Sequence, residues 1–311
     1  MQGPKILVLG NGVMDVVARP VDEVPRTGSV HPQTVTSYPG GCGGNVAVVL
    51  ARLGVQASLL VCIGEDLLGE ALLLAWQGSG VDTSLVGRVS GTPTGIAIVL
   101  VDSSGERRFI STPGANNVLT PAALTPEMLE GVFALHVGGF FAALGLEDGT
   151  LAGKLAEARA RGILTSLDPV GGSARQRREN LYPLLPHLDI LSLNDDEGEK
   201  VTGEREPEAM IGALLALGAR TVILKLGQEG CIVAGEHGAH VVPAFPATVV
   251  DSTGAGDAFD AALLASLARG DRFEEALRWG TAAGAATVEA LGPTGMWRGW
   301  DDLTTIRERR V

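Results

Sequence analysis

The sequence has few cysteines and no long apolar run. Its three cysteines, Cys42, Cys62 and Cys231, are odd in number and widely separated, which argues against both a disulfide framework and a paired Cys-x-x-Cys metal site. No apolar stretch reaches the roughly 18 residues that a transmembrane helix needs, and the run at 5–10 is too short for the core of a signal peptide and predicts a first strand instead. We therefore expect a protein of the reducing cytoplasm that makes no membrane contact.

Positive charge is also scarce. Lys and Arg number 24 against 36 Asp and Glu, so the net charge is -12, whereas proteins that bind nucleic-acid phosphates usually carry a basic surface. The short basic runs at 175–178 and 307–310 are typical of a solvated helix surface. The five histidines show no H-E-x-x-H or similar ligand spacing, so zinc chemistry is not indicated. Nucleic acid is therefore not an expected partner.

The remaining composition suits a folded α/β protein. With 311 residues, of which 45% are hydrophobic, the chain can bury a large core. From about residue 130, short apolar runs alternate with amphipathic segments of helical length, which is typical of a mostly parallel sheet flanked by helices. Gly162, Gly203 and Gly218 lie where helix ends favour a positive φ. The predicted strands are 134–137, 163–167, 189–193 and 221–226, and the predicted helices are 150–161, 175–186, 195–202 and 207–217.

Two segments interrupt this alternation. Residues 13–38 and 92–112 are rich in Val, Thr and Ile and lack a helical pattern. The second contains Asp-Ser-Ser-Gly at 102–105 between two strand-like runs, which is a hairpin signal. We expect the two segments to form a small β-layer beside the main sheet. No internal repeat or interdomain linker is evident, so 1–311 is predicted to be a single domain with this appendage.

A glycine-rich turn leads into a late helix. Residues 250–259 read V-D-S-T-G-A-G-D-A-F and precede an Ala- and Leu-rich helical pattern. Small residues at Gly254, Ala255 and Gly256 let main-chain N–H groups approach a ligand, and a helix N-terminus adds unpaired donors, so the turn suits a phosphoryl group. Asp257 would repel that anion unless it accepts a proton from an attacking hydroxyl, as a kinase requires. From these residues alone, Asp257 could equally cap the helix.

Residues 251–259 resemble the C-terminal signature of the PfkB carbohydrate kinases, the ribokinase-like family. A second glycine-rich segment, 39–47, reads P-G-G-C-G-G-N-V-A and is similar to the family's N-terminal signature. The resemblance implies a three-layer α/β fold with a small β-sheet lid formed by 13–38 and 92–112. It also implies an ATP-dependent kinase that transfers the γ-phosphoryl of ATP to a hydroxyl of a sugar or sugar-like molecule, with Asp257 as general base and 254–256 as the anion hole.

The resemblance assigns four residues to the acceptor. Asp15 occupies the place of the family's sugar-binding aspartate, whose carboxylate can accept hydrogen bonds from two neighbouring hydroxyls. Gly41 and Asn45 of the N-terminal signature would contact acceptor hydroxyls, and Asn116 belongs to a loop that resembles one near the acceptor pocket. Without the resemblance, Asp15 could stabilise a turn, and the glycines could serve close helix packing.

Further segments resemble the nucleotide- and cation-binding motifs of the family. N-D-D-E at 194–197 is similar to its N-x-x-E motif, in which Glu197 orients Mg²⁺ and its waters. Asp251 and Thr253 match positions that help to hold K⁺ in potassium-activated members. From the residues alone, Asn194 could be a helix cap and Lys225 a surface lysine at a strand end. The implied ATP-binding residues are Asn194, Lys225, Gly227, Gly230 and Thr281.

The acceptor itself is left open. Val13 stands where ribokinase-like members often have a polar acceptor contact, and G-G at 138–139 stands where ribokinases carry an acidic sugar ligand. A nucleoside kinase of the same fold remains an alternative. In a different class, a non-catalytic sugar or nucleoside sensor also remains, although the intact Asp257 argues against it. Family members can pair through their lids, so a lid-mediated homodimer is a further hypothesis.

Two other nucleotide-binding classes fit less well. G-N-G at 10–12 follows a strand, but Asp15 replaces the third glycine of a dinucleotide-binding motif and would face a pyrophosphate. G-K at 153–154 is followed by Leu155 and so lacks the Ser or Thr with which a P-loop holds Mg²⁺. A dehydrogenase and a P-loop enzyme are therefore disfavoured.

Overall fold

An eight-stranded sheet forms the centre of the computed structural model, which describes residues 3–170 and 174–309. Six neighbouring strands of this sheet run parallel to one another. Two further strands, β13 and β14, extend one edge of the sheet and pair in the antiparallel direction. The four strands predicted from the sequence are confirmed as β9, β10, β11 and β12. In spatial order the strands are β4 (Gln56–Leu60), β1 (Lys5–Gly10), β9 (Val132–Gly138), β10 (Leu164–Asp168), β11 (Ile190–Asn194), β12 (Thr221–Lys225), β13 (Cys231–Gly235) and β14 (His240–Val242).

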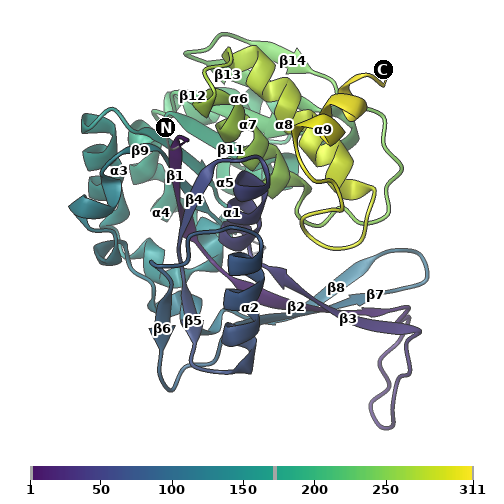
Figure 1. Ribbon diagram of the computed structural model, residues 1–311. Coiled ribbons are helices and arrows are strands. Elements are labelled where there is room, and N and C mark those ends of the chain that lie inside the picture. The colour runs from purple at the N-terminus through teal and green to yellow at the C-terminus, as the bar shows by residue number, and fades with distance from the viewer. Residues whose placement is uncertain (1–2, 171–173, 310–311) are drawn as a thin grey trace.

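Helices cover both faces of this sheet (Figure 1). Successive side chains of a strand point to opposite faces, and in β1 Ile6 and Val8 join one buried apolar cluster while Leu7 and Leu9 join another. This division confirms the predicted three-layer α/β fold. The first face is covered by α1 (Cys42–Arg52), α2 (Leu67–Gly78), α7 (Ala255–Ala268), α8 (Phe273–Val288) and α9 (Trp300–Arg307), and the second by α3 (Leu151–Ala160), α4 (Ala174–Leu181), α5 (Asp195–Thr202) and α6 (Pro207–Ala216).

One predicted helix is shorter than expected. The pattern predicts a helix at 175–186, but α4 ends at Leu181 and a 3-10 segment continues over Tyr182–His187. Pro183 and Pro186 lie in this segment. Proline has no main-chain N–H to donate to a helical hydrogen bond, and its ring clashes with a carbonyl of the preceding helical turn. The other predicted helices agree with α3, α5 and α6, and the three glycines expected at helix ends all have positive φ.

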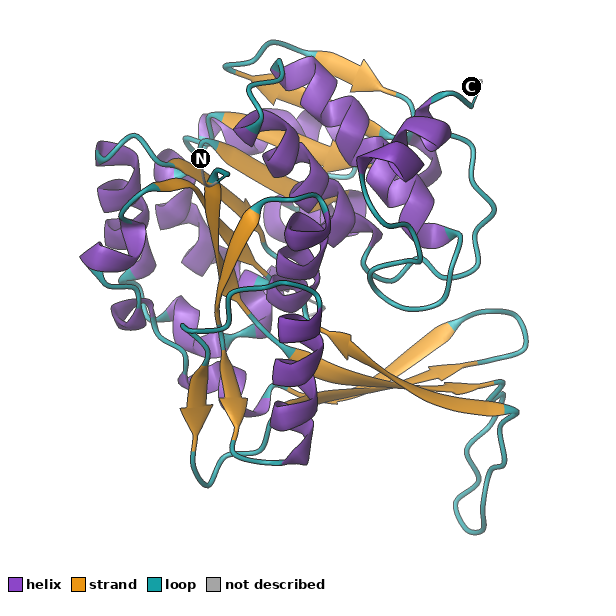
Figure 2. Cartoon of the chain, in the orientation of Figure 1, coloured by secondary structure: helices purple, strands orange, loops and turns teal. Residues whose placement is uncertain are grey.

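A separate four-stranded sheet, called here the lid sheet, projects from the main body (Figure 2). A turn at 102–105 joins its last two strands, as the hairpin signal predicts. The register places Asp15 beside Tyr38 and Ala97 on one face, and Val35, Ile98 and Ile110 on the opposite face. A short two-stranded sheet of β5 (Cys62–Gly64) and β6 (Gly87–Val89) was not predicted. The strands of the lid sheet, in spatial order, are β3 (Thr34–Gly40), β2 (Val13–Arg19), β7 (Gly95–Val101) and β8 (Arg107–Thr112).

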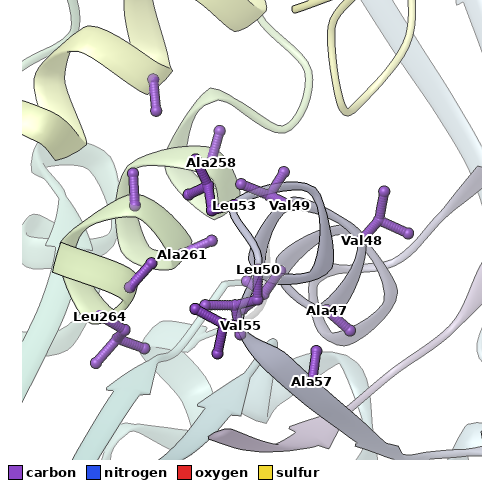
Figure 3. Packing of buried hydrophobic residues seen from close by; sticks show 14 of the residues in the cluster. Ala47, Val48, Val49, Leu50, Leu53, Val55, Ala57, Ala258, Ala261 and Leu264 are labelled. Atoms are coloured by element: carbon purple, nitrogen blue, oxygen red, sulfur yellow. The ribbon is translucent and has the colours of Figure 1, made fainter. Parts of the chain in front are cut away.

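Helices α1 and α7 pack closely through small side chains (Figure 3). Ala258 and Ala261 of α7 lie toward Leu50 of α1, and all three are fully buried in one cluster. Because alanine has a short side chain, the two helices can approach each other closely, and their N-termini meet at the carboxyl edge of the sheet. None of the helices within 3–170 and 174–309 is long and apolar enough to cross a membrane.

The small residues at this contact predict that it cannot hold a larger side chain without loss of stability. Ala261 has no exposed surface, so Ala261→Leu forces extra atoms into a packed contact and is expected to lower the free energy of unfolding by about 1–3 kcal/mol. Urea denaturation followed by circular dichroism measures this change. The matched control is Ala71→Leu on the exposed side of α2, which should change stability by less than about 0.5 kcal/mol. Equal stabilities of the two variants would contradict tight packing of α1 against α7.

Candidate active site

Two glycine-rich motifs that lie far apart in the sequence meet at the N-termini of α1 and α7. The Nδ2 atom of Asn45 donates a hydrogen bond to Oδ2 of Asp257 over 2.7 Å. Both side chains are buried, with exposed fractions of 5% for Asn45 and 7% for Asp257. The sequence predicts both motifs, but it does not predict this direct contact, because a pattern of residues does not state which two helix ends adjoin.

The turn before α7 requires its two glycines for different reasons. Gly254 has a φ of 73°, and a Cβ atom there would lie 1.8 Å from the carbonyl oxygen of Pro293. A Cβ atom at Gly256 would instead lie 3.1 Å from Nζ of Lys225. The first N–H groups of a helix have no partner within it, so the turn presents main-chain donors at the start of α7. This geometry suits the predicted anion site.

Burial perturbs the acidity of Asp257. Burial raises its pKa to about 6, and the nearby Asp168 carboxylate adds to this effect, while the hydrogen bond from Asn45 and the positive charge of Lys225 oppose it. An unperturbed aspartic acid has a pKa of about 3.9. Asp257 is therefore ionised at neutral pH and is a stronger base than an ordinary aspartate, which suits proton acceptance.

Asp15 faces the same region from the lid sheet. A Cβ atom at Gly40 would lie 2.2 Å from Oδ2 of Asp15, so the carboxylate occupies the space that a side chain at 40 would fill. Burial, together with the negative charges of the Asp257 and Asp251 carboxylates, raises the pKa of Asp15 to about 7. The structure thus brings the predicted acceptor-binding aspartate and the predicted base into one electrostatic environment.

Amide side chains hold the connection between β1 and β2. Oδ1 of Asn116 accepts from Gly12 N over 2.9 Å, and its Nδ2 donates to two main-chain carbonyls, one of them that of Gly12. Oδ1 of Asn11 accepts from Cys42 N over 3.0 Å. Gly41 has a φ of 86°, and a Cβ atom there would lie 2.7 Å from Asn11 O. Direct contact of Asn116 or Gly41 with an acceptor stays a prediction. Sequence reasoning misses the role of Asn11, because no motif marks it.

The N-D-D-E motif begins α5 with a capping box. Oδ1 of Asn194 accepts from Glu197 N over 2.8 Å, and Oε2 of Glu197 accepts from Asn194 N over 2.9 Å. The interpretation of Asn194 as a helix cap is therefore confirmed, while its contact with phosphates stays a prediction. Burial, together with the Asp168 carboxylate, raises the pKa of Glu197 to about 7.

Glu197 fits the indirect binding of Mg²⁺. Its carboxylate is buried at the carboxyl end of β11, and Oε1 lies outside the capping box. In the part of the chain that the structure describes, no three His, Cys, Asp or Glu side chains are arranged to hold a metal ion. Mg²⁺ usually binds through one or two carboxylates, waters and substrate phosphates rather than an all-protein cage. A single carboxylate is consistent with that mode.

Lys225 lies at the end of β12 and is mostly buried, with a side-chain exposure of 12%. Its Nζ atom donates to Oδ2 of Asp168 over 2.7 Å and to Oδ2 of Asp260 over 3.2 Å. The interpretation of Lys225 as a surface lysine is therefore wrong. Sequence reasoning misses both aspartates, although Asp168 ends a strand at the carboxyl edge and Asp260 interrupts an Ala- and Leu-rich helix. A polar residue within an apolar pattern is the signal that could have found Asp260.

The remaining predicted nucleotide-binding residues lie in the same half of the chain. Gly227 and Gly230 flank the turn between β12 and β13 with φ values of 56° and 94°. A Cβ atom at Gly230 would lie 2.0 Å from Val242 O, so the turn requires a bare main chain there. Thr281 lies buried in α8, and its hydroxyl donates to the carbonyl of Arg278 over 3.0 Å. Contact of these residues with ATP stays a prediction.

The lid sheet reaches the turn before α7 through Arg107. Its Nη1 atom donates to Oγ1 of Thr253 over 2.6 Å and lies 3.4 Å from Oδ1 of Asp251. The guanidinium also contacts the hydroxyl of Ser252. The two residues predicted to hold K⁺ thus already pair with a protein cation, and they do not fit a bare K⁺ ion in this arrangement. Sequence reasoning misses Arg107, because a charged residue after a hairpin turn indicates only an exposed position.

A groove of about 840 Å³ separates the lid sheet from the loop before α7. Val17 and Val99 line it from the lid sheet, and Val250 and Asp251 line it from the loop. Val17 follows Asp15 by two residues on the same strand, so the two side chains share one face of the lid sheet. The groove therefore opens beside the predicted acceptor-binding aspartate and is large enough for a small molecule.

Comparisons with known proteins agree with this arrangement. The model of the pfkB family carbohydrate kinases matches residues 4–298. Fructokinase-1 of Oryza sativa subsp. japonica is 29% identical over 269 residues, which are 83% of this chain and 82% of that protein. Aminoimidazole riboside kinase of Salmonella typhimurium is 29% identical over 268 residues, which are 82% and 78% of the two chains. Arabidopsis thaliana ribokinase complexed with ribose and ATP superposes with a TM-score of 0.84 at 27% identity, covering 100% of both chains.

The family match extends over almost the whole chain and includes both glycine-rich signatures. It confirms the resemblance that these signatures indicate, and the structural likeness confirms a ribokinase-like fold with a small second sheet. The chain belongs to the pfkB family of ATP-dependent carbohydrate kinases.

Proposed function

We propose that the chain transfers the γ-phosphoryl group of ATP to a hydroxyl of a sugar or sugar-like small molecule, with Asp257 as the general base. One observation carries this proposal: Asp257 is buried in the first turn of α7, hydrogen-bonded to Asn45 and next to a turn that presents main-chain donors. In phosphoryl transfer, a base accepts the proton of the attacking hydroxyl while donors stabilise the charge on the transferred group. The site holds both functions side by side.

The acceptor binds between the lid sheet and the N-terminus of α1. Asp15 accepts hydrogen bonds from acceptor hydroxyls, and Gly41 lets the main chain approach closely. Asn45 uses one amide hydrogen on Asp257, and its amide carries a second hydrogen and an oxygen for the acceptor. Asn116 serves the acceptor pocket by holding the Gly12 main chain. Together these residues place an acceptor hydroxyl next to Asp257.

ATP lies along the carboxyl edge of the sheet, with its γ-phosphoryl at residues 254–256. Lys225 faces that position, and Glu197 holds Mg²⁺ through water. When bound, Mg²⁺ neutralises charge on the phosphates. Closure of the lid sheet over the acceptor excludes water, which would otherwise compete for the phosphoryl group. The other residues proposed to contact ATP are Asn194, Gly227, Gly230 and Thr281.

The known relatives act on different acceptors, so the acceptor class is broad. The matches include a fructokinase, a ribokinase and an aminoimidazole riboside kinase. The last of these favours a nucleoside-like acceptor as a second candidate. At the end of β9, a Cβ atom at Gly139 would lie 2.6 Å from Oδ1 of Asn11, and one at Gly138 would lie 3.2 Å from Gly43 N. An acidic side chain at 139 would therefore have to displace the Asn11 amide, and one at 138 would crowd the Gly43 main chain.

An assay of ATP consumption with Mg²⁺ and K⁺, run against sugars, sugar acids, sugar phosphates and nucleosides, tests the proposal and names the acceptor. Asp257→Asn should lower kcat by about 10²- to 10⁴-fold and leave the KM for ATP nearly unchanged, because the amide keeps the shape of the side chain but cannot accept a proton. Asp271→Asn is the control, since Asp271 lies at the other end of α7, where its carboxylate accepts a hydrogen bond from the Ser266 hydroxyl. Normal turnover of Asp257→Asn would remove Asp257 from the role. Intact ATP binding without any turnover would favour the sensor alternative.

The acidity of the two aspartates predicts the pH dependence. The base must be ionised, so kcat should be high above pH 6 and fall as the pH drops through about 6, where Asp257 takes up a proton. The kcat/KM for the acceptor should begin to fall at about 7, where Asp15 takes up a proton. Ordinary aspartates would keep both parameters constant down to about pH 4. Kinetics from about pH 5 to about pH 9 measure both limbs, and a kcat that stays constant down to about pH 5 would contradict the raised pKa of Asp257.

We also propose that the protein is a cytoplasmic homodimer that pairs through the lid sheet. Val35 and Ile110 lie on the face opposite Asp15 and are 62% and 61% exposed, and exposed apolar side chains that share one face often mark an interface. Light scattering after gel filtration should show a dimer for the wild type and a monomer for Ile110→Lys. Val241→Lys, at a 75% exposed position of β14, is the control and should stay dimeric. A monomeric wild type would contradict the proposal.

A further inference from the structure

A cluster of buried polar side chains lies directly beneath the start of α7. Asp168 ends β10 and Lys225 ends β12, the two strands on either side of β11, and Lys225 joins Asp168 to Asp260 of α7. Ser192 of β11 completes the cluster, because its hydroxyl donates to Oδ1 of Asp260 over 2.5 Å. Asp260 and Ser192 are 1% and 0% exposed. Burying such groups costs free energy, so a helix that only filled the core would do better with an apolar residue at 260.

Asp260 lies on the same side of α7 as Asp257. The two residues are three positions apart, and residues at this spacing are neighbours on a helix surface. Asp260 is surrounded in the sequence by Ala258, Phe259 and Ala261, all of which belong to the buried apolar core. The Asp260 carboxyl therefore lies on the same surface of α7 as Asp257, the proposed base, and not on the surface that carries the apolar side chains.

The ammonium of Lys225 lies beside the predicted anion hole. A Cβ atom at Gly256 would lie 3.1 Å from Nζ of Lys225 and 3.9 Å from Oδ2 of Asp168. Gly256 does not have a positive φ, unlike Gly254, so the close approach of the ammonium, rather than the backbone conformation, favours a glycine at 256. An ammonium has three N–H donors, and the hydrogen bonds to Asp168 and Asp260 use two of them. A third donor remains on the side of Gly256.

Charge is distributed unequally between the two aspartates. Burial alone would raise the pKa of Asp168, but the ammonium of Lys225 lowers it below its ordinary value. Burial raises the pKa of Asp260 well above its ordinary value, although Lys225 opposes this. These directions favour a negative charge on Asp168, beside Lys225, over a second negative charge on Asp260. Asp260 contributes to the cluster through the two hydrogen bonds that its carboxyl oxygens accept from Lys225 and Ser192.

We propose that Asp260 is a positioning residue that, with Ser192 and Asp168, holds the Lys225 ammonium beside Gly256 so that its third N–H contacts the transferring phosphoryl group. This inference rests on the proposed function, which places the γ-phosphoryl at residues 254–256. The ammonium supplies a fixed positive charge next to the equatorial oxygens over which the charge of the transferring group is spread, and it needs no rearrangement to do so. A purely structural cluster would instead only tie β10 and β12 to α7.

Isothermal titration calorimetry separates these two roles without knowledge of the acceptor. The probes are AMP-PNP and ADP, each with Mg²⁺, which differ in the group that would occupy the anion hole. The wild type should bind AMP-PNP more tightly than ADP. Asp260→Ala should reduce this preference by about tenfold, which corresponds to loss of one charge-assisted hydrogen bond. Lys225→Met should reduce it at least as much.

Conservative variants guard against loss of folding. Asp260→Asn should keep the preference for AMP-PNP within about threefold of the wild type, because the amide oxygen can still accept the hydrogen bond that Lys225 donates to Asp260. Ser192→Ala should give a smaller reduction than Asp260→Ala. Asp271→Ala removes the half-buried carboxylate that accepts a hydrogen bond from the Ser266 hydroxyl at the far end of the same helix, and it is the matched control. Its nucleotide preference should equal that of the wild type.

The outcomes distinguish the inference from the proposed function. Equal weakening of AMP-PNP and ADP binding in Asp260→Ala would show a structural cluster and overturn the inference, while the proposed function would stand. A wild type that binds both nucleotides equally would also overturn it. A wild type that binds neither nucleotide would overturn the proposed function and the inference together.

Discussion

The close approach of α1 and α7 is the constraint on which the site depends. The fully buried Ala258 and Ala261 of α7 let the two helices lie near each other, and the N-terminus of each helix carries one of the glycine-rich signatures. As a result, Asn45 and Asp257 come within hydrogen-bond distance although 212 positions separate them. A larger side chain at 261 would separate Asn45 from Asp257 without altering either signature.

The second organising feature is the balance of buried charge at the carboxyl edge of the sheet. Asp168, Glu197, Asp257 and Asp260 are all at most 7% exposed, and the ammonium of Lys225 lies among them. Carboxylates in one low-dielectric region cannot all be ionised at little cost. The structure resolves this by pairing Asp168 with Lys225 and by leaving the other three with raised pKa values. The raised pKa of Asp257, about 6, is consistent with its proposed role as the base.

The lid sheet links the acceptor side of the site to the turn before α7. Asp15 reaches the site from β2, and Arg107 reaches Asp251 and Thr253 from β8. One sheet therefore contacts both the proposed acceptor region and the segment that leads into the anion hole. Movement of the lid sheet would therefore change the positions of Asp15 and of the Arg107 contacts together.

Local patterns in the sequence are sufficient for the family, the order of strands and helices, and the two signatures, because hydrophobic periodicity and glycine-rich turns are encoded by neighbouring residues. They also suffice for Asp257 and Asp15 as candidates. They are insufficient for the hydrogen bond from Asn45 to Asp257, the ion pair of Arg107 with Asp251, and the burial of Lys225 between two aspartates. Each of these contacts joins segments that are distant in the chain, and its existence depends on how the helices and sheets pack. The pKa values of the carboxylates depend on the same packing, because burial and the distance to neighbouring charges exist only in the folded protein.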